Sequence, residues 1–288
     1  MPDSWTIERV LSWAAEDFRR RGLESPRLDA ELIVGHVLGV DRIRLILDRA
    51  RELGGAELAA VRDLIQRRRA GEPVAYLRGT REFYGLPFLV DRRVLVPRPD
   101  TETLVEVALE RTRSHRLGAR VVDLCTGSGC VAIALAHQRP TWQIVGVDVD
   151  AGAVALAREN ALRLGAVPAV QVIQGDLFAP LHGRRFDLVA GNPPYIPTEE
   201  CERLAPTIRD FEPRVALDGG SDGLAVTARI VAEAPAHLEP GGLLALEIGC
   251  DQGDAVAGLF EQAGFVGVRR DRDAGGLERV VSGRYGPE

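Results

Sequence analysis

A rigid corner of one asparagine, two prolines and a tyrosine is the stretch of this sequence best suited to chemistry. It consists of Asn192, Pro193, Pro194 and Tyr195, and it follows RFDLVAG, an apolar run typical of a buried strand. Proline has no backbone N–H, so the corner offers acceptors without competing donors. The Asn192 side-chain oxygen and the Pro193 carbonyl can therefore converge on one –NH2 group. The Tyr195 ring offers a flat face for a planar group.

The nitrogen of a planar amide or amidine is the nucleophile that such a corner would serve. Its lone pair is delocalised, so it reacts poorly unless charge on nitrogen is stabilised in the transition state. Two acceptors that grip its hydrogens would supply that stabilisation. Holding the nitrogen in line with a methyl sulfonium would add proximity, and the proton can leave after transfer. We interpret the corner as an –NH2 clamp; the alternative is a stiff loop that only ends a strand.

A glycine-rich turn, DLCTGSG, is the second candidate site. It follows the apolar run ARVVDL and precedes the helical pattern CVAIALAHQ. Ligands of doubly wound sheets bind beyond the carboxyl ends of the strands, and glycines let the backbone approach them closely. The candidate cofactor-binding residues of this turn are Cys125, Thr126, Gly127, Ser128 and Gly129.

Two carboxylates at the ends of the next predicted strands extend this site. Asp148, about 20 residues after the turn, can accept hydrogen bonds from both hydroxyls of a ribose. Asp176 can accept from an adenine amino group, with Leu177 packing on the ring. These residues predict an adenosine-containing cofactor. Because the turn also fits the dinucleotide pattern G-x-G-x-x-G/A, they leave both NAD and S-adenosylmethionine open.

The elements that must position these residues fall into three segments. Residues 1–70 carry apolar residues at three- and four-residue steps, which predicts a small helical bundle. Residues 71–97 combine aromatic and β-branched residues with turn glycines, which predicts a hairpin linker. In residues 98–288 a helix starts near Asp100 or Thr101, apolar strands then alternate with helices, and the chain closes with an antiparallel hairpin. This order predicts an α/β fold with a doubly wound, mostly parallel sheet.

Composition narrows the functional class. The net charge of −6 argues mildly against long nucleic-acid partners, and the run Arg67–Arg69 is interpreted as a solvated helix end. The four cysteines form no C-x-x-C pair, so we expect reduced thiols, with no metal site and no disulfide framework. No apolar run is long enough to span a membrane, and no secretory signal precedes the helices. We expect a cytoplasmic protein.

The combination of a strand-ending NPPY with the DLCTGSG turn resembles the amino-methyltransferases among the class I S-adenosylmethionine-dependent enzymes, which favours that cofactor over NAD. Further segments resemble the release-factor glutamine methyltransferases, the HemK or PrmC family, over essentially the whole chain. They are GEPVAYLRGTREFYGLPFLV, VLVPRPDTETLVE, EPRVALDGGSDGL and LEIGCDQG. The resemblance implies a Rossmann-like seven-stranded sheet, with the helical segment 1–70 recognising the substrate.

The resemblance also implies a reaction. The family methylates the side-chain amide nitrogen of the glutamine in the Gly-Gly-Gln tripeptide of class I peptide chain release factors, and S-adenosylhomocysteine is the other product. It places the cofactor on the glycine turn, Asp148, Leu177 and Asn192, and the substrate glutamine on Asn192 to Tyr195. Many class I methyltransferases have glycine where this chain has Cys125, so we expect a backbone contact there. Arg98 is expected near the mouth of the site.

Three alternatives stay open at this point. A related group of enzymes methylates a glutamine of a ribosomal protein, but its PR dipeptide is followed by Ser-Pro, whereas this chain has PRPDTE. DNA adenine methyltransferases share NPPY, but they need base flipping and a basic target-recognition region. A non-catalytic module would retain the fold without needing Asn192. We expect a release factor as partner, no direct nucleic-acid or membrane contact, and a monomer.

Overall fold

The computed structural model describes residues 4–113 and 118–286. The outer ends of the predicted segments, residues 1–3 and 287–288, therefore lie outside the described residues. The chain forms two compact units. The first holds the described residues up to Thr80 together with Ala205–Phe211, and the second holds Arg81–Leu204 and the described residues from Glu212 onward.

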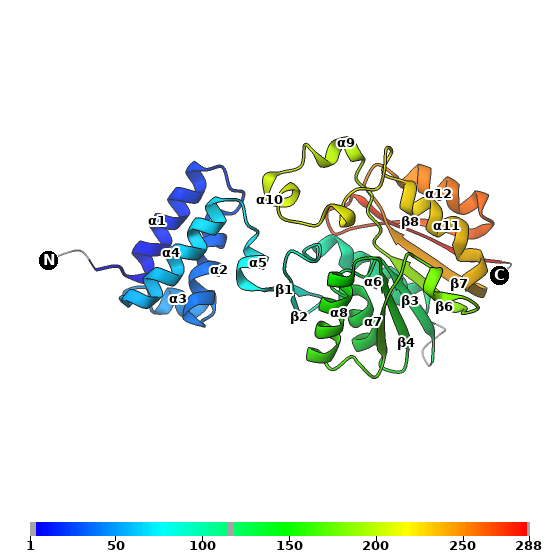
Figure 1. The fold of residues 1–288 in the computed structure, drawn as a ribbon, viewed down its shortest axis with the longest axis horizontal. Coiled ribbons are helices and arrows are strands. Elements are labelled where there is room, and N and C mark those ends of the chain that lie inside the picture. Colours follow the sequence, from blue (N-terminus) through cyan, green and yellow to red (C-terminus); the bar gives the residue numbers. More distant parts are fainter. Residues whose placement is uncertain (1–3, 114–117, 287–288) are drawn as a thin grey trace. The chain divides into compact units, whose positions relative to one another are not determined.

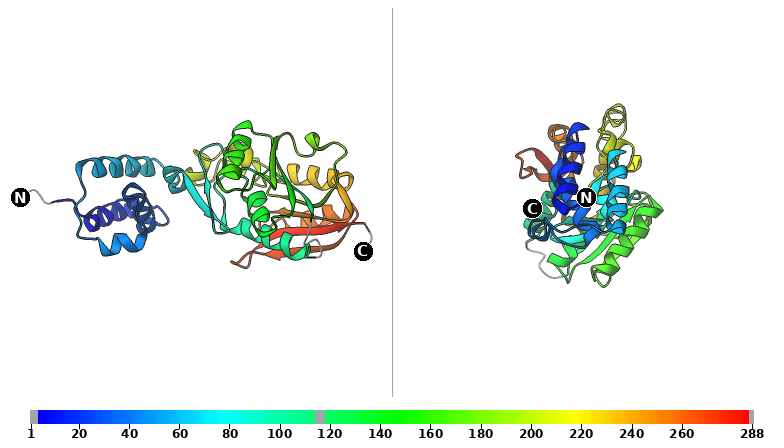
Figure 2. Two further views of the ribbon diagram at one scale, coloured as in Figure 1. Left: turned by 90° about the horizontal axis from the view of Figure 1, so that it is seen from below. Right: turned by 90° about the vertical axis from the view of Figure 1, so that its left-hand side faces the viewer.

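The first unit is helical, as the apolar periodicity predicts (Figures 1 and 2). Its helix α1 begins after Thr6, whose hydroxyl accepts the Arg9 N–H, and α2 begins with Pro26, which needs no N–H partner there. The apolar stripe of α1 packs into the core of this unit. The helices of the unit are α1 Ile7–Arg20, α2 Pro26–Leu38, α3 Arg42–Leu47, α4 Gly55–Arg69, α5 Val74–Arg78 and α10 Pro206–Arg209.

The arginine run at the end of α4 is not the solvated helix end that the sequence predicts. Arg68 is only 8% exposed, and its Nε donates to Asp29 Oδ2 at 2.8 Å. Arg67 pairs with Glu72 and Arg69 with Asp17. The sequence could not reveal this, because the acidic partner of Arg68 lies in another helix.

The predicted hairpin linker is shorter than residues 71–97. It consists of β1 Thr80–Phe83 and β2 Leu86–Leu89, which pair with each other. The stretch VAYLR before it is the helix α5, which ends at Gly79 with φ +67°. Only glycine adopts that backbone conformation without strain, so a helix followed by a hairpin fits this sequence better than a longer hairpin.

The second unit contains a seven-stranded sheet in the order β5-β4-β3-β6-β7-β9-β8. Strand β9 runs antiparallel to both neighbours, and the other pairings are parallel. This confirms the predicted doubly wound, mostly parallel sheet and its terminal hairpin. The strands are β3 Arg120–Leu124, β4 Gln143–Asp148, β5 Val170–Gln174, β6 Phe186–Gly191, β7 Leu238–Glu247, β8 Phe265–Arg272 and β9 Glu278–Tyr285.

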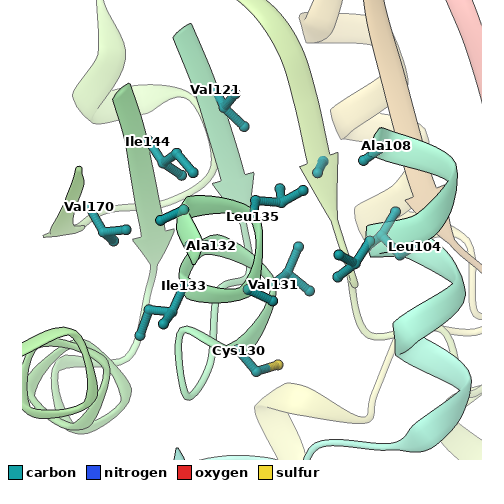
Figure 3. Close-up of a cluster of buried hydrophobic side chains, with 14 of the residues drawn as sticks. Leu104, Ala108, Val121, Cys130, Val131, Ala132, Ile133, Leu135, Ile144 and Val170 are labelled. Carbon is teal, nitrogen blue, oxygen red and sulfur yellow. The ribbon is translucent and has the colours of Figure 1, made fainter. Parts of the chain in front are cut away.

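Helices cover both faces of this sheet (Figure 1). Alternate strand residues point to opposite faces, so Val121 belongs to one buried cluster and Val122 to the other. Figure 3 shows the first cluster, to which Val121 of β3 and Val131 and Leu135 of α7 belong. On this face lie α6 Glu102–Arg111, α7 Cys130–Gln138 and α8 Ala151–Arg163; on the other lie α11 Ala225–His237 and α12 Gly253–Gln262.

Short helical turns complete the unit, and they occur mainly in the loops that follow the strands. They are η1 Pro99–Thr101, η2 Ala179–Leu181, α9 Thr198–Cys201 and η3 Arg214–Ala216. None of the helices in the described residues is long and apolar enough to cross a membrane.

Strands β3 and β6 lie side by side at the centre of the sheet, where the strand order reverses. Leu124 pairs in register with Gly191, so Cys125 and Asn192 both follow the sheet at the same level. In doubly wound sheets this switch point, at the carboxyl ends of the strands, is where ligands bind. The topology therefore brings the two predicted motifs to one place.

Candidate cofactor and substrate site

A cavity of about 290 Å³ lies at this switch point, and it is lined only by residues of the second unit. Nine of the predicted site residues contribute to its wall: Cys125, Thr126, Gly127, Ser128, Asp148, Asp176, Leu177, Asn192 and Pro194. The other predicted residues, Gly129, Pro193 and Tyr195, are not among the residues that line it. The structure thus gathers the glycine turn, the two carboxylates and the NPPY corner around one space.

Buried Asp123 stabilises the glycine turn through hydrogen bonds. It is 1% exposed, and its Oδ2 accepts hydrogen bonds from the Thr126 hydroxyl at 2.6 Å and from the Ala132 N–H at 3.2 Å. Burial raises the pKa of Asp123 to about 7. The sequence analysis did not single out this residue, although it is the first letter of the DLCTGSG motif.

The glycines of the turn have different functions. Gly127 (φ +53°) donates its N–H to Asp148 Oδ2 at 2.9 Å. Gly129 (φ +81°) precedes α7, and a Cβ there would approach Ile133 and the Ala157 Cβ at 3.2 and 3.3 Å. Gly129 therefore permits close helix packing, whereas Gly127 leaves the cavity side of the turn open. Behind the turn, buried Asn160 donates its amide to the Ser128 carbonyl at 2.9 Å.

Asp148, at the end of β4, lies in the cavity wall, and its role as a ribose partner stays a prediction. Its Oδ1 accepts the Asp150 N–H at 3.0 Å and its Oδ2 accepts the Gly127 N–H. Burial raises its pKa, and these backbone hydrogen bonds oppose the rise. Each carboxylate oxygen accepts more than one hydrogen bond, so Asp148 retains acceptor capacity for a ligand in the cavity.

The far end of the cavity is formed by Asp176, Leu177 and Arg229. Arg229 Nη2 lies 2.8 Å from Asp176 Oδ2, so an exposed ion pair already engages one oxygen of the carboxylate that is predicted to accept from adenine.

Two residues of the cavity wall have a left-handed backbone conformation: Leu177 adopts φ +48°, and Cys125 adopts φ +56°. Both are non-glycine residues in a strained backbone region, and both line the same cavity. Burial raises the pKa of the Cys125 thiol, which therefore stays protonated.

The NPPY corner is oriented by buried side chains from other segments. Asn192 Nδ2 donates to Thr101 Oγ1 at 3.3 Å. The Tyr195 hydroxyl donates to Glu247 Oε1 at 3.4 Å, and burial raises its pKa to about 12. Gln252 Nε2 donates to the Tyr195 carbonyl at 2.9 Å. Asn192 faces the cavity, whereas the Tyr195 hydroxyl is directed toward the protein interior.

The segment DGGSDG supports this corner from outside. The Ile196 N–H bonds to the Leu217 carbonyl at 3.0 Å, and the Gly219 N–H bonds to the Ile196 carbonyl at 2.8 Å. A Cβ on Gly219 would lie 2.6 Å from the Pro194 carbonyl oxygen, and one on Gly223 would lie 2.3 Å from the Tyr195 carbonyl oxygen. No side chain fits at these glycines, which explains their place in the sequence.

Arg98 lies in the cavity wall near Thr101 and Asn192. Its Nη2 donates to Glu212 Oε1 at 2.6 Å, and buried Glu212 also accepts the Val96 N–H at 3.2 Å. Arg98 is thus a fixed positive charge at the cavity.

Within residues 4–113 and 118–286, no three His, Cys, Asp or Glu side chains lie close enough together to bind a metal ion.

The residues that sequence reasoning missed are Asp123, Thr101 and Glu247. Asp123 had a local signal in its motif. Thr101 was noted only as a possible helix cap, and Glu247 only as a letter in LEIGCDQG. Thr101 and Glu247 form hydrogen bonds with residues that are 91 and 52 positions away in the chain, Asn192 and Tyr195. No spacing rule reveals such pairs.

Known proteins share both the sequence and the fold of this chain. The family model "PrmC N-terminal domain" matches residues 9–79, and "Methyltransferase small domain" matches residues 100–206. The release factor glutamine methyltransferase of Geobacter sulfurreducens is 47% identical over 285 residues, which cover 99% of each chain. That of Salmonella typhimurium is 42% identical over 267 residues, which cover 93% of this chain and 95% of the relative.

Solved structures show the same architecture in more distant proteins. A methyltransferase from Pyrococcus furiosus superposes with a TM-score of 0.54 at 19% identity, covering 71% of this chain and 91% of its own. At that identity the likeness demonstrates the fold and nothing finer.

Proposed function

Because this chain belongs to the release factor glutamine methyltransferases, we propose that it methylates the side-chain amide nitrogen of the Gly-Gly-Gln glutamine in class I peptide chain release factors. The observation that carries this proposal is the in-register pairing of Leu124 with Gly191 at the ends of adjacent strands, which Cys125 and Asn192 directly follow. It sets a cofactor turn and an –NH2 clamp on the same cavity.

The cavity suits S-adenosylmethionine, the cofactor of this family. Gly127 presents no Cβ to the space above the turn, and a carboxylate stands at the position expected for a ribose partner. Asp148 would hold the ribose, Leu177 would pack on the adenine, and the backbone from Cys125 to Gly129 would line the methionine portion. When bound, the cofactor supplies an electrophilic methyl group.

The protein's part in the reaction is to bind and polarise the glutamine amide. Asn192 Oδ1 and the Pro193 carbonyl would accept its two hydrogens, and Tyr195 would pack against its plane. Both acceptors favour positive charge on the nitrogen as the new bond forms, which lowers the barrier electrostatically. The proton then leaves the methylated nitrogen, so the clamp needs no ionised base.

The other substrates that share an –NH2 group receive less support. The relatives from Geobacter sulfurreducens and Salmonella typhimurium, which match this chain over nearly its whole length, are release factor glutamine methyltransferases. A DNA adenine enzyme would need a basic target-recognition region, whereas Arg67, Arg68 and Arg69 are engaged in ion pairs. The ribosomal-protein enzymes differ at the segment PRPDTE. A release factor remains the best supported substrate.

The helical unit is the part that we assign to substrate recognition. A release factor is far larger than the glutamine side chain, and the second unit already accounts for the cofactor cavity and the clamp. A substrate of the translation apparatus also favours a cytoplasmic location. We expect the enzyme to act as a monomer.

A methyl-transfer assay tests the proposal. The enzyme and labelled S-adenosylmethionine would be combined with a class I release factor, with its Gly-Gly-Gln→Gly-Gly-Ala version, with ribosomal protein, or with DNA. Peptide mass spectrometry would locate the methyl group. We expect one methyl on the glutamine and none on the substituted factor. Label on ribosomal protein or DNA alone would overturn the substrate and leave the –NH2 clamp in place.

A further inference from the structure

We propose that Thr101 is a positioning residue that, together with Glu247, fixes which side of the Asn192 carboxamide faces the substrate. The inference deepens the proposed function and rests on it. It concerns a series of four side chains between the cavity and the core of the second unit. Asn192 is hydrogen-bonded to Thr101 and Tyr195 to Glu247, and Thr101 lowers the pKa of the Glu247 carboxyl.

The clamp requires a specific orientation of Asn192. The two ends of a carboxamide have almost the same shape, but one is an acceptor and the other is a double donor. Only the oxygen can accept a hydrogen from a glutamine –NH2. A flipped Asn192 would turn its own N–H groups toward the N–H groups of the substrate, and the two sets of donors would repel each other. Something in the protein must therefore distinguish the two orientations.

Thr101 makes that distinction from within the wall of the cavity. It is 2% exposed, so water does not replace its partners, and its Oγ1 lies 3.3 Å from Asn192 Nδ2. A hydroxyl has one hydrogen to donate and lone pairs with which to accept. If that hydrogen points to Glu247, the lone pair accepts from Asn192 Nδ2. Asn192 Oδ1 is then directed to the substrate.

Glu247 sets the direction of the series because an ionised carboxylate only accepts hydrogen bonds. It is 1% exposed, its Oε1 accepts from the Tyr195 hydroxyl at 3.4 Å, and the Thr101 hydroxyl also interacts with it. Its Oε2 is buried with no hydrogen-bond partner among the described residues. Tyr195 and Asn192, the two ends of the clamp, are therefore linked to one acceptor.

The ionisation of Glu247 makes the direction of the series dependent on pH. Burial raises its pKa to about 7, while Thr101, Arg279 and Tyr195 oppose the rise and Asp100 adds to it. These groups belong to η1, β9 and the NPPY corner, and the Cys130 thiol at the start of α7 also interacts with the carboxyl. Below that pH the protonated carboxyl can donate to Thr101. The Thr101 hydrogen then turns toward Asn192, which favours the flipped carboxamide.

The first test uses two substitutions at Thr101 and a matched control. Thr101→Val keeps the shape and removes the hydroxyl, so we expect kcat to fall roughly tenfold or more, the range for one lost hydrogen bond that acts in the transition state. The affinity for S-adenosylhomocysteine should stay unchanged. Thr101→Ser should restore kcat to within about threefold of the unmodified enzyme. Thr227→Val is the control, because Thr227 is also buried but lies outside the cavity wall and has no hydrogen-bond partner among the described residues.

The second test follows the pH profile of kcat with saturating cofactor and release factor. The unmodified enzyme should lose activity as the pH falls through about 7, and Glu247→Gln should have lower activity without that acid limb. Tyr195→Phe removes one donor to the same carboxyl with little change of shape. If Glu247→Gln does not fold, Tyr195→Phe takes its place, and its acid limb should shift to higher pH because the lost hydrogen bond lowers the pKa of Glu247.

The outcomes separate this inference from the proposed function. If the unmodified enzyme methylates no release-factor glutamine, the proposed function fails. If it does, but Thr101→Val retains full kcat, or Thr101→Ser is as impaired as Thr101→Val, the positioning role is wrong and Thr101 only packs. An acid limb that persists in Glu247→Gln, or that does not shift to higher pH in Tyr195→Phe, would remove Glu247 from the series.

Discussion

The glycine turn and the NPPY corner occupy equivalent places at the ends of adjacent strands, yet they are held in different ways. The turn is fixed by Asp123, which bonds to residues three and nine positions further along. The corner is fixed by Thr101, Glu247 and Gln252, which are 91, 52 and 57 residues away from their partners in it. The other partners of the turn, Asp148 and Asn160, lie within 32 residues of it, whereas the partners of the corner come from two segments that are more than 50 residues away.

This difference indicates how each half of the site can fail. A locally built turn is damaged mainly by changes within its own motif, and the loss appears in cofactor binding. A corner assembled from remote segments is sensitive to residues that never touch the substrate, and the loss appears in methyl transfer. Substitutions can therefore separate the two halves, and the expected effects are given from the largest to the smallest.

The clamp should show the largest effect. Asn192→Ala removes an acceptor that acts on charge developing at the substrate nitrogen, so kcat should fall by about 10² to 10³. Affinity for S-adenosylhomocysteine, measured by calorimetry, should be partly retained because the glycine turn does not depend on Asn192. Transfer at the unmodified rate would show that the corner is not a clamp.

A substitution in the cofactor site should reduce cofactor affinity more than the rate of methyl transfer. Asp148→Ala should weaken cofactor affinity by roughly tenfold to a hundredfold, the range for lost hydrogen bonds to a charged group. Transfer at saturating cofactor should remain closer to that of the unmodified enzyme. If affinity is unchanged, Asp148 does not hold the ribose and acts only on the Gly127 N–H.

A remote glycine should affect the corner through packing alone. Gly219→Ala places a Cβ 2.5 Å from the Gly223 carbonyl oxygen and 2.6 Å from that of Pro194. The strain should destabilise the protein by about 1–3 kcal/mol and reduce transfer. Gly258→Ala is the matched control, since it lies in α12 and its Cβ meets open space. That control should raise stability by about 0.5–1 kcal/mol, because alanine favours helices. Equal thermal shifts for both variants would contradict the packing argument.

The smallest effect should come from Cys125. Cys125→Gly relieves a left-handed backbone, while the added freedom of the unfolded chain opposes this gain, so stability should change by less than about 1 kcal/mol. Cys125→Val should destabilise by roughly 1–2 kcal/mol, because a β-branched residue tolerates positive φ poorly. Thermal unfolding of the pair measures the difference. A glycine variant that loses cofactor affinity would show that the thiol itself contacts the ligand.

The sequence by itself determined the architecture and the chemistry of the two motifs. Apolar runs alternating with helical patterns predicted the sheet, because strands buried on both faces must be apolar. Carboxylates and glycines at strand ends predicted the cofactor side, since doubly wound sheets bind ligands there. Local rules also placed the NPPY acceptors, because proline fixes the backbone direction within a few residues.

Only the tertiary structure decided which distant residues complete the site. The partners of Arg68, Asn192 and Tyr195 are Asp29, Thr101 and Glu247, and each belongs to another segment of the chain. The helix α5, within the predicted hairpin, is a different case, because its C-terminal Gly79 is a local signal. Periodicity and spacing act over one or two turns of a helix or one strand. A buried hydrogen bond depends on how whole elements pack, and the packing is set by the combined cores on both faces of the sheet.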